Sequence, residues 1–153
     1  YIPIQLNKNT TIVAQATSQS SEEFQTYANI MLNAGVNPNS PYSAISFDTM
    51  MLAALALQHQ AHNNISKEDL SKSLVSVANP PGIKMGPGSW EAARALLVRG
   101  VEINYEGVSG SLDFDINGDV EGMYSLNQVT EDNLWSVERL EKLHPFEPRI
   151  IID

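Results

Sequence analysis

The sequence predicts an α/β fold in which helices pack on a sheet. Apolar residues recur at helical spacing in several segments between residues 20 and 100. Residues 101–129 instead carry β-branched and aromatic residues that alternate with polar ones and are interrupted by glycines. A hydrophobic share of 42% in 153 residues is enough apolar material for one buried core.

Composition narrows the class of protein. The formal net charge of −9 argues against nucleic acid and anionic membranes as partners, because both attract clustered lysine and arginine. Cysteine is absent, which removes disulfides, thiolate zinc sites and cysteine nucleophiles, and which suits a bacterial envelope protein. The longest apolar run, at residues 50–57, is far shorter than the ~18 residues of a membrane span.

The first expected elements are a strand and a capped helix. β-Branched residues in the segment 10–16 predict a strand. Ser20 and Glu23 have the spacing of a capping box, which predicts that a helix begins there. Gly35 follows the last residue of the helical pattern and is expected to end this helix.

A long helix is expected over about residues 42–62. Ser40 is the predicted N-cap, with Pro41 at the first helical position. The segment is apolar on most sides, which predicts a helix buried all round. Its apolar residues, of which Phe47, Met51 and Leu55 are expected under a sheet, are Ala44, Phe47, Met50, Met51, Leu52, Leu55 and Leu57.

Two shorter helices should follow. Ser66 and Asp69 form a second capping pair, and residues 79–88 resemble a rigid connector because they are rich in proline and glycine. Ser89 is the predicted N-cap of a further helix, which Gly100 ends.

Residues 113–124, "DFDINGDVEGMY", allow two interpretations. An EF-hand calcium loop needs oxygen ligands at positions 1, 3 and 5 and a glycine at position 6, as Asp113, Asp115, Asn117 and Gly118 provide. Position 12, however, is Tyr124 instead of a bidentate glutamate, and the flanking sequences are strand-like. The residues therefore do not fit a calcium site.

The same segment fits a β-hairpin better. Leu112, Phe114 and Ile116 alternate with aspartates at a period of two. Asp115 suits the first position of a type I turn, and Gly118 can take the left-handed conformation that closes the loop. This register sets Phe114 opposite Val120. The sequence thus predicts a hairpin without calcium.

Candidate catalytic and metal-binding residues are few. His59 and His62 have a spacing that can place two imidazoles on one metal, but no third ligand lies near them in sequence. The favoured interpretation is two solvated histidines near a helix C-terminus. No nucleophile motif or phosphate loop is present, so the sequence predicts no enzyme, no metal and no cofactor.

The order of motifs resembles a known family. The segments "SPYSAISFDTMMLAALAL", "NPPG" and "INYEGVSGSLDFDINGD" are similar to the C-terminal half of the type I periplasmic solute-binding proteins, the branched-chain amino-acid receptors of ABC importers. The resemblance covers about residues 20–130. It implies a periplasmic-binding-protein type I-like lobe, with helices packed on a sheet and a C-terminal β-hairpin.

This resemblance also implies a function. The expected ligand is an amino acid or similar small polar solute, and the expected partner is the membrane permease of an ABC importer, in the periplasm or outside the cell. The alternative is a ligand-sensing receptor or regulatory domain of the same fold. Family members are about twice as long, so residues 1–153 are expected to be a fragment of a two-lobed protein that self-associates and binds leucine-like amino acids weakly or not at all.

Three ligand-binding residues follow from the resemblance. Tyr42, Ser43 and Ser46 match the segment that leads into a helix whose N-terminus faces the cleft of the family. An aromatic wall and hydroxyls at a helix N-terminus suit the carboxylate of a small zwitterion. In the competing interpretation, Tyr42 and Phe47 are core residues and the serines cap the helix.

Overall fold

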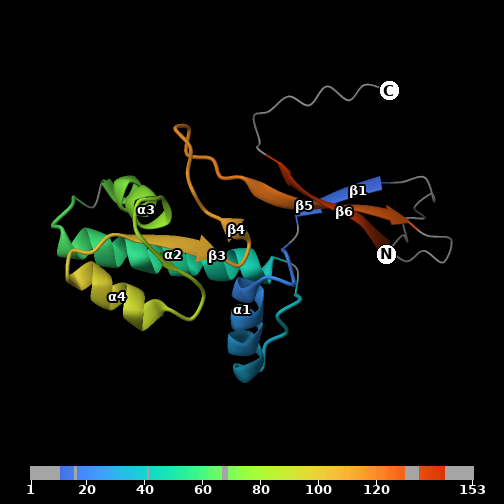
Figure 1. Ribbon diagram of the computed structural model, residues 1–153, viewed down its shortest axis with the longest axis horizontal. Coiled ribbons are helices and arrows are strands. Elements are labelled where there is room, and N and C mark those ends of the chain that lie inside the picture. Colours follow the sequence, from blue (N-terminus) through green and yellow to red (C-terminus); the bar gives the residue numbers. More distant parts are fainter. Residues whose placement is uncertain (1–10, 16, 41, 67–68, 130–134, 144–153) are drawn as a thin grey trace, which may run out of the picture. The chain divides into compact units, whose positions relative to one another are not determined.

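The computed structural model describes residues 11–15, 17–40, 42–66, 69–129 and 135–143. The chain divides into two compact units. The smaller unit combines Tyr1–Ala16 with Gly122–Asp153, and the larger unit is Thr17–Glu121. The expected α/β class is confirmed, because helices pack against strands in the larger unit (Figure 1).

The smaller unit contains three antiparallel strands in the order β1-β5-β6. They are β1 (Thr11–Gln15), β5 (Gly122–Val129) and β6 (Trp135–Leu143). Val13 pairs with Leu126, and a register shift between Leu126 and Asn127 interrupts the β5–β6 ladder. The predicted N-terminal strand is confirmed, whereas β6 was not expected because its charged residues obscure the alternation.

The larger unit arranges four helices around a small mixed sheet of order β2-β3-β4. Strand β3 pairs in parallel with β2 and antiparallel with β4, and α4 is the crossover between the parallel strands. The elements are α1 (Glu22–Asn33), α2 (Ser43–His62), α3 (Leu70–Ala78), β2 (Ile83–Met85), α4 (Trp90–Val98), β3 (Ile103–Gly107) and β4 (Gly110–Ser111). The prediction that residues 79–88 are only a connector is therefore wrong, because β2 lies within them.

The ends of α1 lie close to their predicted positions. Ser21, one residue later than predicted, is the N-cap, and its hydroxyl accepts the Phe24 N–H at 3.0 Å. The predicted Ser20–Glu23 capping box is therefore wrong by one position. Gly35 adopts a φ of +72° directly after the C-cap, as expected of a helix terminator.

The start of α2 differs from the prediction. Tyr42 is the N-cap and has a left-handed φ of +62°, so Ser40 lies outside the helix and Pro41 is not among the described residues. For the later helices, Asp69 and Ser89 occupy the N-cap positions, and Gly100 follows the end of α4 with a φ of +71°. Neither N-cap side chain makes a capping hydrogen bond.

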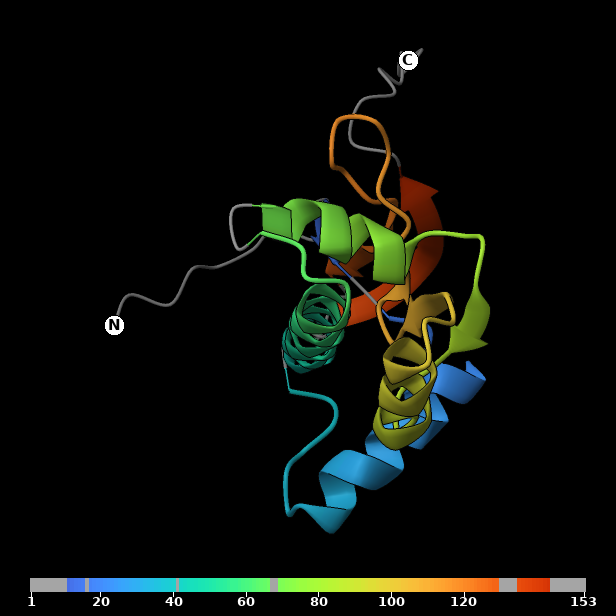
Figure 2. The same cartoon turned by 90° about the vertical axis from the view of Figure 1, so that its left-hand side faces the viewer.

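The core forms where α2 meets α3, α4 and β3. Figure 2 views α2 nearly along its axis, with α3 above it and α4 to one side. Leu55 of α2 is fully buried, as predicted, and packs in one cluster with residues of the other three elements. The buried members of this cluster are Leu52, Leu55, Ala56, Val77, Ala78, Ala93, Leu97, Ile103 and Tyr105.

The prediction that α2 is buried all round is wrong. Met50 is 71% exposed and Leu57 is 54% exposed, whereas Phe47 and Met51 are half-buried. The core elements cover one side of α2, and the opposite side keeps its apolar residues at the surface. Phe47 instead packs edge-on against Tyr27 of α1, with ring centroids 5.2 Å apart, in a second and smaller cluster.

A buried carboxylate joins α2 to the β3–β4 turn. Asp48 is 1% exposed, and its Oδ1 accepts the Tyr105 hydroxyl at 3.0 Å and the Val108 N–H at 2.9 Å. Its Oδ2 accepts the Ser109 N–H at 2.7 Å and the Ser109 hydroxyl at 2.6 Å. Both oxygens are thus saturated, which is the condition for burying a carboxylate in a stable protein.

Residues 113–124 contain a turn without a flanking helix, as predicted. The Asp115 carboxylate accepts the N–H groups of Asn117 and Asp119 at 2.8 and 2.9 Å, and Gly118 has a φ of +85°. The predicted strands beside the turn are wrong, because residues 112–115 and 119–121 lie in no strand. The side chain of Asn79 instead donates to the C=O of Phe114 and accepts its N–H, so Phe114 does not pair with Val120 through these groups.

Substitution of Leu55 tests the position of the core. We expect Leu55→Ala to lower the free energy of unfolding by about 2–5 kcal/mol, because it leaves a cavity among fully buried neighbours. Leu57→Ala is the matched control on the exposed side of α2 and should change it by no more than about 0.5 kcal/mol. Urea denaturation measures both, and equal effects would contradict the observed burial.

Substitution of Asp48 tests the buried carboxylate. Asp48→Asn preserves size but sets an amide N–H₂ against hydrogen-bond donors, so we expect a loss of about 2–4 kcal/mol in the free energy of unfolding. Glu91→Gln makes the same chemical change in an exposed pair with Arg94 and should cost less than about 1 kcal/mol. If Asp48→Asn is as stable as the parent chain in thermal and urea unfolding, the role of the carboxylate is refuted.

Candidate functional site

The three ligand-binding residues that the resemblance implies lie at the N-terminus of α2. They are Tyr42, Ser43 and Ser46. Tyr42 is 72% exposed and Ser46 is exposed as well. The Ser43 hydroxyl is already engaged, since it accepts the Tyr27 hydroxyl at 2.7 Å and approaches the C=O groups of Pro38 and Ser40. Tyr42 and Ser46 are therefore accessible to a ligand, whereas Ser43 holds the preceding loop against α1.

The two histidines of α2 have different surroundings. His62 is exposed, as expected, but the prediction that His59 is simply solvated is wrong. The Nδ1 of His59 lies 3.2 Å from the hydroxyl of Ser73, and its Nε2 lies 3.3 Å from that of Ser76, so this ring links α2 to α3. Burial, followed by the charge of His62, lowers the pKa of His59, and Glu102 partly opposes this shift.

A pocket lies at the carboxyl ends of the parallel strands β2 and β3, beside the first turns of α1. It is an open pocket with a volume of about 390 Å³. Its walls are Glu22, Glu23 and Thr26 of α1, Lys84 of β2, Glu106 of β3 and residues 85–87. In open α/β sheets, the carboxyl ends of parallel strands are the usual location of a ligand site.

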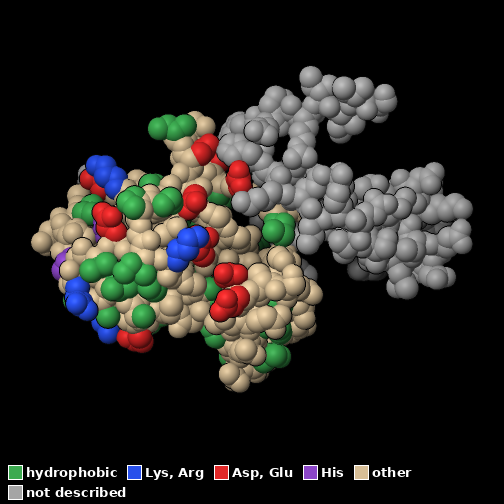
Figure 3. Space-filling model, viewed as in Figure 1, with side chains coloured by type: hydrophobic (Ala, Val, Ile, Leu, Met, Phe, Trp, Pro, Cys, Tyr) green, Lys and Arg blue, Asp and Glu red, His purple; other side chains and the backbone are tan. Residues whose placement is uncertain are grey.

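The charges in this pocket are predominantly negative. Three glutamates face one lysine, whose Nζ lies 2.8 Å from Oε1 of Glu106. The hydrogen bond to Glu106 and its charge raise the pKa of Lys84, and the charges of Asp113 and Glu23 contribute in the same direction. On the side of the molecule that Figure 3 shows, acidic side chains gather beside a basic one near the middle of the view.

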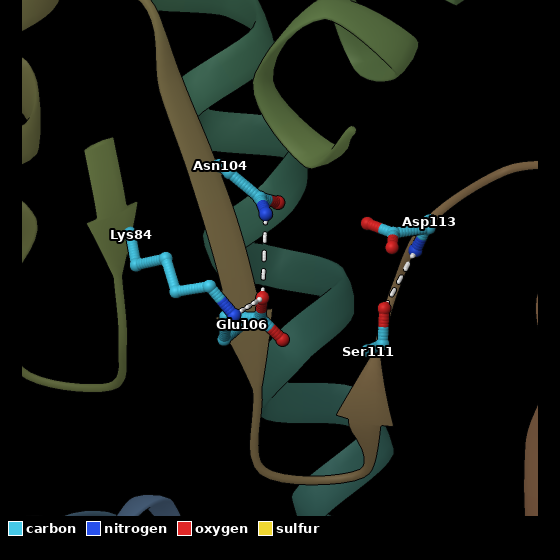
Figure 4. Close-up of polar contacts among 5 residues, drawn as sticks. All are labelled: Lys84, Asn104, Glu106, Ser111 and Asp113. Carbon is cyan, nitrogen blue, oxygen red and sulfur yellow. Dashed lines mark hydrogen bonds and ion pairs between the residues drawn. The ribbon is translucent and has the colours of Figure 1, made fainter. Parts of the chain in front are cut away.

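Asn104 lies behind the Glu106 carboxylate. It is 4% exposed, and its Nδ2 donates to Oε1 of Glu106 at 3.2 Å. Its Oδ1 is buried without a hydrogen-bond partner. Figure 4 shows Lys84 approaching Glu106 from β2, while Asp113 directs its carboxylate toward Asn104 and Glu106 from the other side. This arrangement is rich in acceptors and has few donors.

Reasoning from the sequence did not identify this pocket. Its residues come from α1, β2 and β3, and β2 was hidden in a segment taken for a connector. One signal in the sequence could have pointed to this strand face. Asn104 and Glu106 are two residues apart in a strand, so these two polar side chains share a face. In the described ranges, no group of three or more His, Cys, Asp or Glu side chains is placed to hold a metal ion.

Comparison with known protein families matches residues 5–132 to the receptor family ligand binding region. The chain belongs to this family. Neither the curated proteins nor the solved structures contain a match to the chain. A receptor family ligand binding region has a type I periplasmic-binding-like architecture, which agrees with helices packed on a small mixed sheet. Among the described residues, no helix has the length and hydrophobicity needed to span a membrane.

The pKa shift of His59 predicts how stability depends on pH. Its folded pKa lies below the ordinary value of about 6.5, so the unfolded chain takes up the proton first as pH falls. We therefore expect stability to decrease from pH 6.5 down to the folded pKa and to be unaffected by this group above pH 6.5.

Urea denaturation between pH 5 and 8 measures this dependence. His59→Gln should flatten the loss of stability below pH 6.5, whereas His62→Gln, at the exposed neighbour, should retain most of it. An unchanged slope in His59→Gln would assign the effect to other groups.

Proposed function

We propose that this ligand-binding region is the extracytoplasmic solute receptor of an ABC importer and captures an amino acid or similar small polar solute. The observation that carries the proposal is the pocket at the carboxyl ends of β2 and β3, in a chain of a ligand-binding family. Its volume of about 390 Å³ falls in the range of small-molecule sites. A membrane permease is the proposed partner that accepts the solute.

The chemistry of the pocket supports a polar solute. Glu22, Glu23 and Glu106 offer carboxylates to an ammonium group, and the hydrocarbon parts of residues 85–87 give the solute apolar contacts. Tyr42 and Ser46, which are exposed at the start of α2, are proposed as a further contact surface. The resemblance suggests closure of two lobes on the ligand, driven by contacts that are better in the closed state.

The second candidate is a sensory domain of the same fold, which signals ligand occupancy instead of delivering cargo. The family description, a receptor family, favours it as much as it favours transport. The two candidates differ in the partner. A transport receptor stimulates ATP hydrolysis by its importer when it carries the solute, whereas a sensory domain does not.

Ligand titration followed by NMR tests the pocket, because chemical shifts detect binding even at Kd values of about 1 mM. We expect at least one standard amino acid to shift the amide signals of β2, β3 and the first turn of α1. Thr26→Trp fills the pocket and should abolish these shifts, whereas Thr49→Trp on the exposed side of α2 should leave them. Absence of saturable shifts with every solute would refute the proposed function.

A further inference from the structure

The turn at residues 115–119 contains an asparagine that has no part in the proposed function. Asn117 is followed by Gly118, and no other asparagine in the sequence precedes a glycine. Asn117 and Gly118 are exposed, and Ile116 beside them is 100% exposed. In Figures 1 and 2 the loop after β4 extends away from the helices of the larger unit. The tip of this turn is therefore open to water.

An asparagine followed by glycine is chemically reactive. The backbone nitrogen of the second residue can attack the side-chain carbonyl of the first and close a five-membered ring, and a side chain on the second residue hinders this attack. Gly118 has no side chain, and even an added Cβ atom would meet nothing within 4 Å, so there is room for the ring. The turn also requires this glycine, because its φ is +85°. The fold thus retains the reactive pair.

Hydrogen bonds to Asp115 restrain both reacting groups while the turn is closed. The N–H of Gly118 donates to the C=O of Asp115 at 3.1 Å, which engages the attacking nitrogen. The Nδ2 of Asn117 donates to Oδ2 of Asp115 at 3.3 Å, which holds the leaving group. Both donors belong to exposed residues, and an exposed segment with few apolar contacts opens locally at little cost in free energy. The restraint therefore slows the reaction without preventing it.

We propose that Asn117 is a site of spontaneous deamidation in the folded protein and that its products cannot close this turn. The Gly118 nitrogen loses its proton to the solvent and bonds to Cγ of Asn117. The bond from Cγ to Nδ2 breaks, and Nδ2 takes up a proton and leaves as ammonia. Water then adds to either carbonyl of the resulting succinimide and opens the ring, which yields aspartate or isoaspartate. Water is the only reactant consumed.

Both products conflict with the closed turn. The Nδ2 donor of Asn117 becomes a carboxylate oxygen, so its hydrogen bond to Oδ2 of Asp115 becomes a contact between like charges. In isoaspartate the main chain passes through the former side chain and is one carbon longer, which moves the Gly118 N–H away from the C=O of Asp115. Deamidation therefore adds one negative charge and opens the turn.

Incubation of the folded chain in mildly alkaline buffer, followed by peptide mass spectrometry, tests the reaction. We expect the peptide that contains Asn117 to gain about 1 Da and to include isoaspartate, which direct hydrolysis of the side-chain amide cannot give. Asn39 is exposed and precedes Ser40, so it is the internal control and should react about 10-fold more slowly. Asn37 should form no ring, because Pro38 has no backbone N–H.

The same incubation in urea gives the rate in the unfolded chain. Reaction of Asn117 in urea but not in buffer would show that the closed turn protects it, and this would overturn the proposal. No reaction under either condition, or a product without isoaspartate, would overturn it as well. The outcome is independent of the proposed function, because neither Asn117 nor Gly118 lines the pocket.

Amide hydrogen exchange tests the opening of the turn. Asn117→Asp reproduces one product, and the Asp119 N–H, which donates to Oδ1 of Asp115 at 2.9 Å, should exchange about 10-fold faster in this variant. Asn39→Asp adds the same charge to another exposed loop and is the matched control, in which the exchange of Asp119 should not change. Equal exchange in Asn117→Asp and in the parent chain would refute the opening of the turn.

Discussion

The carboxylate of Asp48 is the interaction on which the larger unit depends. It joins the first turns of α2 to a strand and turn far along the chain, and it satisfies two backbone N–H groups that the β3–β4 turn leaves without strand partners. Gly107 is required beside it, because a Cβ atom there would lie 2.6 Å from Oδ2 of Asp48. Burial and the negative charge of Asp48 together raise the pKa of Tyr105, which keeps this hydroxyl a donor.

This anchor determines which face of β3 enters the core. Since side chains alternate along a strand, holding Tyr105 against Asp48 sends Ile103 into the same core and leaves Asn104 and Glu106 on the opposite face. A slip of one residue would bury Glu106 and expose Tyr105. The parallel register, in which Lys84 pairs with Asn104, then brings the lysine to the glutamate. The geometry of the pocket is in this sense a consequence of a contact made on the other face of the sheet.

The sequence predicted those helix ends and turns that depend only on residues close together in the chain. Gly35, Gly100 and Gly118 each adopt the positive φ expected of a helix end or turn. The exposure of Met50 and Leu57 could not be predicted in this way, because a uniformly apolar helix carries no record of which side its neighbours cover. The error in the predicted hairpin also has a non-local cause. The backbone N–H and C=O of Phe114 bond to the side chain of Asn79, which lies 35 residues earlier in the chain, and not to a neighbouring strand.

The candidate site was less predictable than the fold, and its residues differ in how well the fold explains them. Glu22 and Glu23 lie in the first turn of α1, where negative charge stabilises any helix, so their presence does not require a ligand. Glu106 and Asn104 lie in strand β3, so the helix dipole does not explain why these polar residues stand there. Placing them together leaves a buried acceptor without a donor, at a cost on the order of 1–3 kcal/mol. Natural proteins retain such local conflicts mainly at functional sites. Of this strand face only Glu106 lines the pocket, with Asn104 buried beside it.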